Sequence, residues 1–248
     1  MLAARSEHAI EALGRELAVT HAVRVKTMPV DLSLPGAPQA MEQALGDASV
    51  DVDVLVNNAG ALAEGPFAAG ALDDQLNLLQ INVVALTALT RLFLPAMIAR
   101  GAGRILNVAS IAAFMPLPQL AIYAATKAYV LSLTEAVGEE LKGTGVTATA
   151  LCPGLTDTGM LRGSRLGRPM PAMMTMTPKD VAEAGCAACL RGEAIAVPGL
   201  ANKLIAGGAS LAPRGLVKAI GGAMNGGGWE RLAGVLQGLA AARGRAKE

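Results

Sequence analysis

The stretch VDVLVNNAG, residues 52–60, joins a short apolar run to a polar turn that ends in glycine. Residues 52–56 predict a short strand that is buried on both faces, as strands of a parallel sheet are. In open α/β sheets, ligands bind beyond the carboxyl ends of the strands. The stretch therefore predicts an α/β fold with a binding site where residues 57–60 leave the strand.

Similar apolar runs alternate with helix-like segments along the chain. Helices are expected at residues 7–20, 38–45, 73–100 and 121–141, and strands at 23–29, 104–108 and 147–151. This order is typical of a doubly wound parallel sheet with helices on both faces. We expect one such domain over residues 1–190, followed by a helical, glycine-rich extension, residues 191–248, packed on the same domain.

The composition narrows the kind of partner. With 248 residues, 52% of them hydrophobic, the chain can bury one large core. Its 21 Lys and Arg balance 20 Asp and Glu, which gives no electrostatic reason to expect nucleic acid or an anionic membrane. The most apolar stretch, residues 81–99, contains Asn82, Arg91 and Pro95, which argues against a transmembrane segment. A small molecule is the expected ligand.

The three cysteines are Cys152, Cys186 and Cys189, and they lack the spacing of a disulfide framework. A reducing compartment, the cytoplasm, is therefore expected. Cys186 and Cys189 form a Cys-x-x-Cys motif, which could be a redox pair or half of a metal site. No His or second cysteine pair accompanies them in their apolar segment, so we expect core packing and no metal.

Tyr123 and Lys127 lie four residues apart on a predicted helix and so share one face. A neighbouring ammonium lowers the pKa of a phenol from its ordinary value of about 10, which favours proton exchange. Ser110 follows the predicted strand 104–108, where its hydroxyl could hydrogen-bond a substrate oxygen. A Tyr-x-x-x-Lys also occurs by chance on helices, so its significance depends on the residues around it.

Taken together, these residues resemble the classical short-chain dehydrogenase/reductases over roughly residues 1–190. The motifs that carry the resemblance, in the family's order and spacing, are Asn57-Asn58-Ala59-Gly60, Asn82, Ser110, Tyr123-Ala124-Ala125-Thr126-Lys127 and Pro153-Gly154-Leu155-Thr156-Asp157-Thr158. The resemblance implies a Rossmann-like fold and an oxidoreductase that interconverts a carbonyl and an alcohol with a nicotinamide cofactor. It also implies a homodimer or homotetramer.

The resemblance assigns roles to four side chains. Tyr123 would exchange a proton with the substrate oxygen, and Ser110 would polarise that oxygen. Lys127 would lower the pKa of Tyr123 and bind the nicotinamide ribose. Asn82 would hold a water that links Lys127 to solvent; taken alone, it would be a buried residue that caps or kinks its helix.

Further residues would hold the cofactor. Asp31 would contact adenine, although a turn or cap aspartate looks the same in sequence. The resemblance implies cofactor contacts from Asn58, Ala59, Gly60, Pro153, Gly154, Thr156 and Thr158, besides Tyr123 and Lys127. Arg5 and Ser6 stand where the family accommodates a ribose 2′-phosphate, which favours NADP(H) over NAD(H), because a guanidinium binds phosphate bidentately. Arg5 could also be a plain surface arginine.

The family's first strand, its Thr-Gly-x-x-x-Gly-x-Gly turn and its first helix have no counterpart in the sequence. In the family that turn binds the pyrophosphate with backbone N–H groups. Two interpretations remain. One is an NADP(H)-dependent oxidoreductase whose chain starts further upstream, and the other is a non-catalytic partner subunit or unstable fragment that cannot hold the cofactor. The complete set of Asn82, Ser110, Tyr123 and Lys127 favours the first.

The substrate is expected under residues 159–177, where the family has a covering loop. The apolar residues of this segment are Met160, Leu161, Met170, Met173, Met174 and Met176. They favour an adaptable pocket for an acyl chain, a steroid-like molecule or another hydrophobic carbonyl compound, although methionines also fill ordinary cores. The glycine-rich last fifty residues predict helices packed on the domain or a second subunit, a substrate lid, or a membrane-surface contact.

Overall fold

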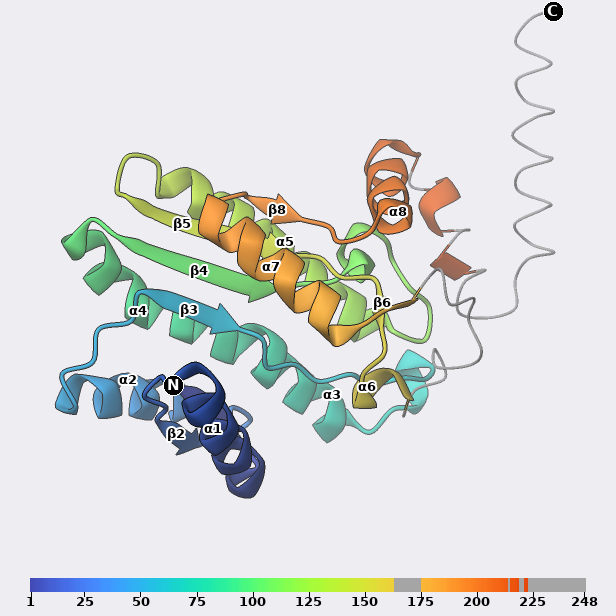
Figure 1. Ribbon diagram of the computed structural model, residues 1–248. Helices are drawn as coiled ribbons and strands as arrows, with labels where there is room; N and C mark the ends of the chain where they lie inside the picture. Colours follow the sequence, from blue (N-terminus) through green and yellow to red (C-terminus); the bar gives the residue numbers. More distant parts are fainter. Residues whose placement is uncertain (163–174, 214, 219–220, 223–248) are drawn as a thin grey trace, which may run out of the picture.

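The computed structural model describes residues 1–162, 175–213, 215–218 and 221–222. Its central sheet is parallel, with strand order β3 (Val54–Asn57), β4 (Gly103–Val108), β5 (Val146–Leu151) and β8 (Ile195–Ala196). Helices cover both faces: α4 (Leu86–Arg100) and α5 (Ala121–Glu140) on one side and α7 (Pro178–Arg191) on the other (Figure 1). The α/β prediction is confirmed.

The N-terminal residues form a smaller unit beside this sheet. Strands β1 (Leu2–Ala4) and β2 (Thr27–Pro29) pair in parallel, and α1 (Glu7–His21) and α2 (Ala37–Asp47) accompany them. Helix α2 packs on α4, its Met41 and Leu45 sharing a core cluster with α4 side chains. Within the described ranges no ladder joins β1 to β3, so the sheet is interrupted between these two strands.

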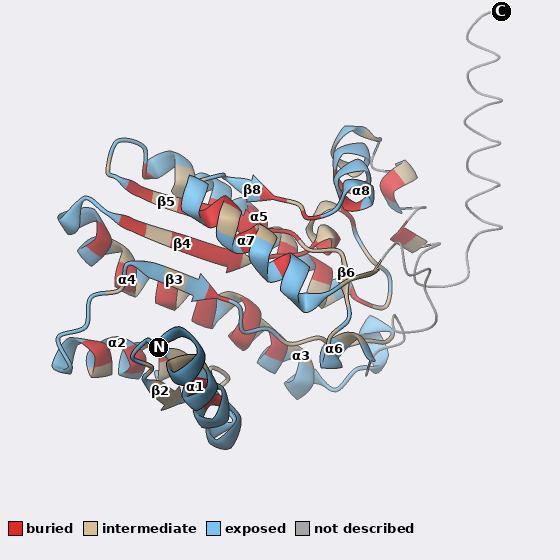
Figure 2. Cartoon of the chain, viewed as in Figure 1, coloured by how far each residue is buried: buried red, intermediate tan, exposed pale blue. Residues whose placement is uncertain are grey.

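The exposure of β3 contradicts the prediction of a strand buried on both faces. Val54 and Val56 are exposed, whereas Leu55 packs into the core on the side of α4 (Figure 2). Successive side chains of a strand point to opposite faces, and β3 pairs with β4 alone in the described part of the chain. The interruption opens one edge of β3, and the face with Val54 and Val56 is exposed because α7, the helix on that side of the sheet, packs on β4 and β5. The strand predicted at 23–29 is shorter in the structure, where β2 spans Thr27–Pro29. Its partner β1 has only three residues to pair with it.

The predicted long helix is present with a change of helix type in its middle. It consists of α3 (Leu72–Leu79), a π-helical segment (Gln80–Ala85) and α4. This 29-residue stretch, with a mean hydropathy of 1.8 in its most apolar window, is the only one in the described residues long and apolar enough to cross a membrane. Leu89, Phe93 and Met97 are buried against the sheet, so the helix is a core layer of the domain.

A buried polar network fixes the end of β3. Asn57 Nδ2 donates to Asn107 Oδ1 at 2.8 Å and to Thr90 Oγ1 at 3.1 Å, and Asn107 Nδ2 donates to Thr134 Oγ1 at 2.9 Å. The network joins two strands to two helices, and buried polar side chains with paired partners hold one geometry. It positions the turn at residues 58–60.

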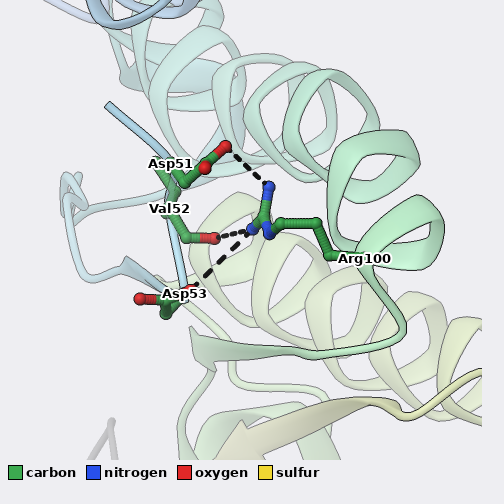
Figure 3. Close-up of polar contacts among 4 residues, drawn as sticks. All are labelled: Asp51, Val52, Asp53 and Arg100. Atoms are coloured by element: carbon green, nitrogen blue, oxygen red, sulfur yellow. Dashed lines mark hydrogen bonds and ion pairs between the residues drawn. The ribbon is translucent and has the colours of Figure 1, made fainter. Parts of the chain in front are cut away.

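The opposite end of β3 is held by Arg100, at the end of α4. Its guanidinium donates to the Val52 carbonyl at 2.8 Å and to Asp51 Oδ1 at 3.0 Å, with Asp53 Oδ1 at 4.0 Å (Figure 3). Both aspartates are exposed to solvent, and exposed ion pairs contribute about 0–1 kcal/mol. The contact sets the register of the segment that enters β3 more than it stabilises the fold.

The remaining elements lie at the carboxyl ends of the strands or extend from them. They are η1 (Phe67–Ala69), η3 (Ile111–Phe114), β6 (Leu155–Thr156), α6 (Gly159–Arg162), β7 (Thr175–Met176) and α8 (Leu200–Leu211). Short strands β6 and β7 pair with each other, and α8 packs on η3. The expected extension of 191–248 is described only in its first part, where a helix packs on the domain; residues 223–248 lie outside the described ranges.

Candidate active site

Two cavities lie at the carboxyl ends of the strands and share the turn 58–62 as a wall. Cavity A, about 770 Å³, lies between the N-terminal unit and β3. Cavity B, about 600 Å³, lies above β4 and β5 and extends to α5. Their shared lining includes Asn58, Ala59 and Gly60, the turn expected to line a cofactor. Both volumes fall in the range of small-molecule sites.

The predicted catalytic side chains meet in cavity B. Ser110, Tyr123 and Lys127 all line it, from the end of β4 and from one face of α5. The Ser110 hydroxyl lies near enough to the Tyr123 phenol to lower the pKa of that phenol, and it donates to the Pro153 carbonyl at 3.5 Å. The Ser110 oxygen also accepts from Ala112 N at 3.1 Å, which holds the side chain in place at the start of η3. A substrate oxygen in cavity B can thus reach two hydroxyls at once.

Lys127 lies on the same helix face as Tyr123 but points past it. Its Nζ donates to the Val108 carbonyl at 2.7 Å and lies 5.8 Å from the Tyr123 ring centroid. Burial lowers the pKa of Lys127 to about 8, partly offset by Cys152. The ammonium form of Lys127 is therefore less favoured in the folded protein than in water, although it still predominates at neutral pH.

Tyr123 differs from the sequence expectation in the direction of its pKa shift. Burial raises the pKa of the phenol, and the Ser110 hydrogen bond opposes that rise without reversing it. Burial therefore determines the direction of the shift, and a lowering of this pKa by Lys127 stays a prediction. Tyr123 thus keeps its proton at neutral pH and can act as a proton donor.

Asn82 lies in the π-helical segment and binds backbone. Its Oδ1 accepts from Ala61 N at 2.8 Å, and its Nδ2 donates to the Ala61 carbonyl at 3.0 Å and to Thr126 Oγ1 at 3.1 Å. π-helical turns are rare overall, but those that occur are often found at functional sites. The two bonds to Ala61 pin the turn shared by both cavities to the π-helical segment, and the bond to Thr126 joins that segment to α5. The predicted water contact of Asn82 is not tested here and stays a prediction.

We expect Asn82→Ala to lower the free energy of unfolding by about 2–3 kcal/mol, because it removes a buried side chain and leaves both backbone polar groups of Ala61 without their partner. The exposed Asn77→Ala, one helical element earlier, is the matched control and should change stability by less than about 0.5 kcal/mol. Denaturant unfolding followed by circular dichroism measures both. Equal effects for the two variants would show that Asn82 does not pin the turn.

Two of the residues predicted to bind the nucleotide end of the cofactor lie at cavity A, and one does not. Arg5 and Asp31 line the cavity. Asp31 Oδ1 also accepts from Ser33 N at 2.9 Å, which lowers the pKa of the carboxyl, so the turn role considered from sequence is real as well. Ser6 lines neither cavity and begins α1, its carbonyl accepting from Ile10 N. Its role as a phosphate contact stays a prediction.

The segment after β5 lies at cavity B, and its predicted contacts with the cofactor stay a prediction. Pro153, Gly154, Thr156 and Thr158 all line cavity B. A Cβ on Gly154 would lie 2.6 Å or less from three side-chain atoms of Asn202, so only glycine fits between this segment and α8.

The substrate-covering segment is only partly described. Met160 and Leu161 line cavity B, and Met176 contacts Asn202. Met170, Met173 and Met174 lie outside the described residues.

Three site residues were not identified from sequence. Thr126 donates to the Tyr123 carbonyl at 2.8 Å and accepts from Asn82. Asn107 organises the buried network under the turn, and Asn202 walls cavity B behind Gly154. The Thr126 position was visible inside the Tyr-to-Lys motif, but its bond to a residue 44 positions away could not be foreseen. Asn202 comes from α8, whose position no local pattern indicates.

The cysteines are all free, which agrees with the expected absence of disulfides. Cys152 and Cys189 are buried, but Cys186 is exposed, so core packing is right for one member of the Cys-x-x-Cys pair only. The helix α7 turns Cys189 toward the sheet and Cys186 toward solvent. In the described residues no group of three or more His, Cys, Asp or Glu side chains could hold a metal ion.

The residues at the two cavities fit a nicotinamide dinucleotide. The Asn57 Oδ1 atom is buried at cavity A and has no protein partner, so it can accept a hydrogen bond from a ligand. Gly60 leaves room at the shared wall, since a Cβ there would lie 3.5 Å from Asn82 Oδ1 and 3.7 Å from Lys127 Nζ. A dinucleotide can extend from Arg5 in cavity A to Lys127 in cavity B along this wall.

The parallel sheet with a groove at its carboxyl edge and a Ser–Tyr–Lys cluster defines an α/β protein of the Rossmann class. The sequence profile of the short chain dehydrogenase family matches residues 1–168. The chain therefore belongs to the short chain dehydrogenase family, a family of oxidoreductases.

Relatives and solved structures agree with this membership. Ketoacyl reductase HetN from Nostoc sp. is 39% identical over 158 residues, 63% of this chain and 55% of that protein. Very-long-chain 3-oxoacyl-CoA reductase-A from Danio rerio is 32% identical over 69% of this chain and 55% of that protein. The chain thus spans about half the length of these curated relatives.

Two solved structures share the fold. A short-chain dehydrogenase from Sphingobium yanoikuyae, in complex with NADPH, has a TM-score of 0.74 at 28% identity and covers 97% of this chain and 84% of its own. A 7beta-hydroxysteroid dehydrogenase has a TM-score of 0.79 at 22% identity, with 89% and 85% covered. At that identity the second likeness supports the fold alone.

Proposed function

We propose that this protein is an NADP(H)-dependent oxidoreductase that interconverts a carbonyl and an alcohol on a hydrophobic small molecule. The observation that carries the proposal is the convergence of Ser110 and Tyr123 on cavity B, with the Lys127 Nζ 5.8 Å from the Tyr123 ring. Asn82 acts as a positioning residue that fixes the shared wall of the two cavities.

In the reducing direction the residues divide the work between them. A bound nicotinamide would supply the hydride to the carbonyl carbon. The Tyr123 phenol gives its proton to the substrate oxygen, and the Ser110 hydroxyl donates a hydrogen bond to the same oxygen. Lys127 places a positive charge near the phenolate that remains and so stabilises it. The raised pKa of Tyr123 suits this direction, since the phenol must be protonated before the step.

The substrate class follows from the lining of cavity B. Besides the catalytic group its walls are mostly apolar, with Ile111, Met115, Leu117, Leu120 and Leu161. Apolar walls with a few converging polar groups select a hydrophobic compound and orient its single reactive oxygen. An acyl chain or a steroid-like ketone fits this description, and the names of the ketoacyl and 3-oxoacyl-CoA reductase relatives support the acyl class.

The first experiment is a titration of the purified chain with NADPH and then NADH, followed by cofactor fluorescence and by thermal unfolding. NADPH binding in the micromolar range with a raised Tm supports the proposal. A folded chain that binds neither nucleotide would instead support the non-catalytic partner or fragment considered from sequence. The open edge of β3, with Val54 and Val56 exposed, is the observation that favours this second candidate.

The cofactor preference rests on Arg5, which lines cavity A beside Asp31. We expect Arg5→Glu to weaken NADPH binding at least about tenfold, through loss of a charge-assisted pair and repulsion of the 2′-phosphate, while NADH binding changes little. Arg15→Glu, on the exposed side of α1, is the matched charge reversal away from the cavities. If both reversals weaken NADPH equally, Arg5 is a plain surface arginine.

The proposal also includes a location in the cell and an oligomeric state. Three free cysteines agree with a reducing compartment, so we place the protein in the cytoplasm. We also propose a homodimer or homotetramer, in line with the family resemblance, and sedimentation velocity tests it.

A further inference from the structure

Helix α8 (Leu200–Leu211) turns its largest apolar side chains toward solvent. Leu200, Leu204 and Leu211 are 75%, 70% and 90% exposed, and 3.6 residues per turn place them on one side of the helix. Asn202 and Ala206, on the opposite side, are buried against the domain. Helices of soluble domains normally bury their apolar side, so the pattern here is inverted. We call these three residues the leucine stripe.

The stretch of sequence that carries the leucine stripe is basic. Residues 194–248 carry seven Lys and Arg against two Asp and Glu, whereas residues 1–193 carry fourteen against eighteen. From residue 194 to 229 there is no acidic residue, and Lys203 and Lys218 are both exposed. The near-neutral charge of the whole chain therefore hides an excess of positive charge at one end, and charge asymmetry of this kind favours an anionic surface as partner.

The leucine stripe lies on the outside of a wall of cavity B. Helix α8 packs on η3, which contributes Ile111 to the cavity lining, and Asn202 closes against Gly154. The segment after α8 returns to the same wall, where Gly221 packs on the Pro116 carbonyl. In Figure 1, α8 lies at the end of the molecule toward which the strands β5 and β8 point, at their carboxyl ends. The exposed apolar face and the apolar cavity are thus two sides of one layer of the protein.

We propose that the leucine stripe, with Lys203 and Lys218, binds the surface of an anionic phospholipid bilayer. The leucines enter the boundary between headgroups and acyl chains, and the ammonium groups meet lipid phosphates. A second copy of the chain is a poorer occupant, because two equally basic faces repel each other. The inference goes beyond the proposed function and needs no catalysis. If both hold, a hydrophobic substrate reaches cavity B from the lipid.

The test is sedimentation of the full chain with vesicles of equal parts phosphatidylglycerol and phosphatidylcholine, compared with phosphatidylcholine alone. We expect binding to the anionic vesicles that weakens with added salt. Leu200→Ser with Leu204→Ser should lower the partition coefficient at least about tenfold, since the leucines that enter the bilayer provide much of the binding free energy. Lys203→Gln with Lys218→Gln should lower it about fivefold per charge.

The matched control is Leu72→Ser with Leu76→Ser on α3. These leucines are also four residues apart and are 65% and 52% exposed, but Asp73 and Asp74 lie beside them. The control pair should leave vesicle binding unchanged.

Each of the following results overturns the proposal. The wild-type chain could stay in solution with anionic vesicles, or the stripe variant could bind as well as the wild type. A Tm lowered by several degrees in the stripe variant would show that the stripe packs against another part of the chain. A dimer that becomes a monomer in the stripe variant, with vesicle binding unchanged, would make the stripe a contact between two copies.

Discussion

Tyr123→Phe is expected to lower kcat for carbonyl reduction by about 10²–10⁴-fold, the range that a positioned general acid contributes. Phenylalanine keeps the ring in cavity B and removes only the hydroxyl that would protonate the substrate. NADPH binding should change much less than kcat. Steady-state kinetics with a hydrophobic ketone, together with NADPH titration of the variant, separate the two effects.

The chain supplies its own control for this substitution, because it has two tyrosines on the same helix. Tyr129 is exposed, and its hydroxyl lies 3.0 Å from Thr87 Oγ1, away from both cavities. Tyr129→Phe should keep kcat within about twofold, since only a solvent-exposed hydrogen bond is lost. A Tyr123→Phe variant that kept a tenth or more of the activity would mean that another group protonates the substrate.

Lys127→Met is expected to lower kcat/KM by at least about 10²-fold while making the fold more stable at pH 7. The folded-state pKa of Lys127, about 8, lies below the ordinary 10.5, so the folded protein binds its proton less tightly than the unfolded chain. The destabilisation is complete below pH 8 and is relieved as the pH rises from about 8 to 10.5. Methionine removes the buried charge and gives up the bond to the Val108 carbonyl, for a net gain of about 1–3 kcal/mol at pH 7.

Denaturant unfolding of wild type and Lys127→Met at pH 7, 8 and 9 checks this prediction through their difference. Cys152, whose pKa burial raises to about 12, is present in both proteins, so the effect of its burial cancels in the difference and only its electrostatic interaction with Lys127 remains. Its contribution falls with rising pH above the ordinary thiol pKa and so has the opposite sign. Lys142→Met, an exposed lysine, should show no such difference. A gap between wild type and Lys127→Met that stayed constant with pH would show that Lys127 is not desolvated.

The same lysine predicts the upper limit of the pH profile for carbonyl reduction. As the pH rises through about 8, Lys127 loses its proton and with it the charge that stabilises the phenolate of Tyr123. The rate of reduction should therefore fall above about pH 8. A flat profile from pH 7 to 10 would contradict the assigned role.

The sequence analysis located most of the fold and of the site for a local reason. Helix and strand patterns depend on residues a few positions apart, so the boundaries of α1, α2, α5 and the whole stretch from α3 to α4 lie within one or two residues of those expected. Tyr123 and Lys127 face one cavity because they are one helical turn apart, which the spacing alone determines. The ends of parallel strands meet at one edge, which brought Ser110 and the turn after β3 to the same groove.

Side-chain exposure, side-chain direction and pKa shifts were not predictable from local sequence, because they depend on contacts between distant segments. The exposure of Val54 and Val56 depends on which helix covers their face of β3, and the contact of Lys127 with the Val108 carbonyl depends on how α5 packs over β4. The direction of the Tyr123 pKa shift follows from burial, a property of the assembled cavity.

The sequence by itself determined the family, the strand–helix order and the catalytic group, because these depend on residue type and short spacing. Only the tertiary structure decided that Asn82 binds the Ala61 backbone, that Ser6 lies away from the cavities, and that α8 turns its leucines to solvent. The physical reason is that a hydrogen bond needs a partner, a cavity needs walls, and a side chain is exposed or buried according to what packs on it. In each case the neighbouring residues come from parts of the chain that are far away in sequence.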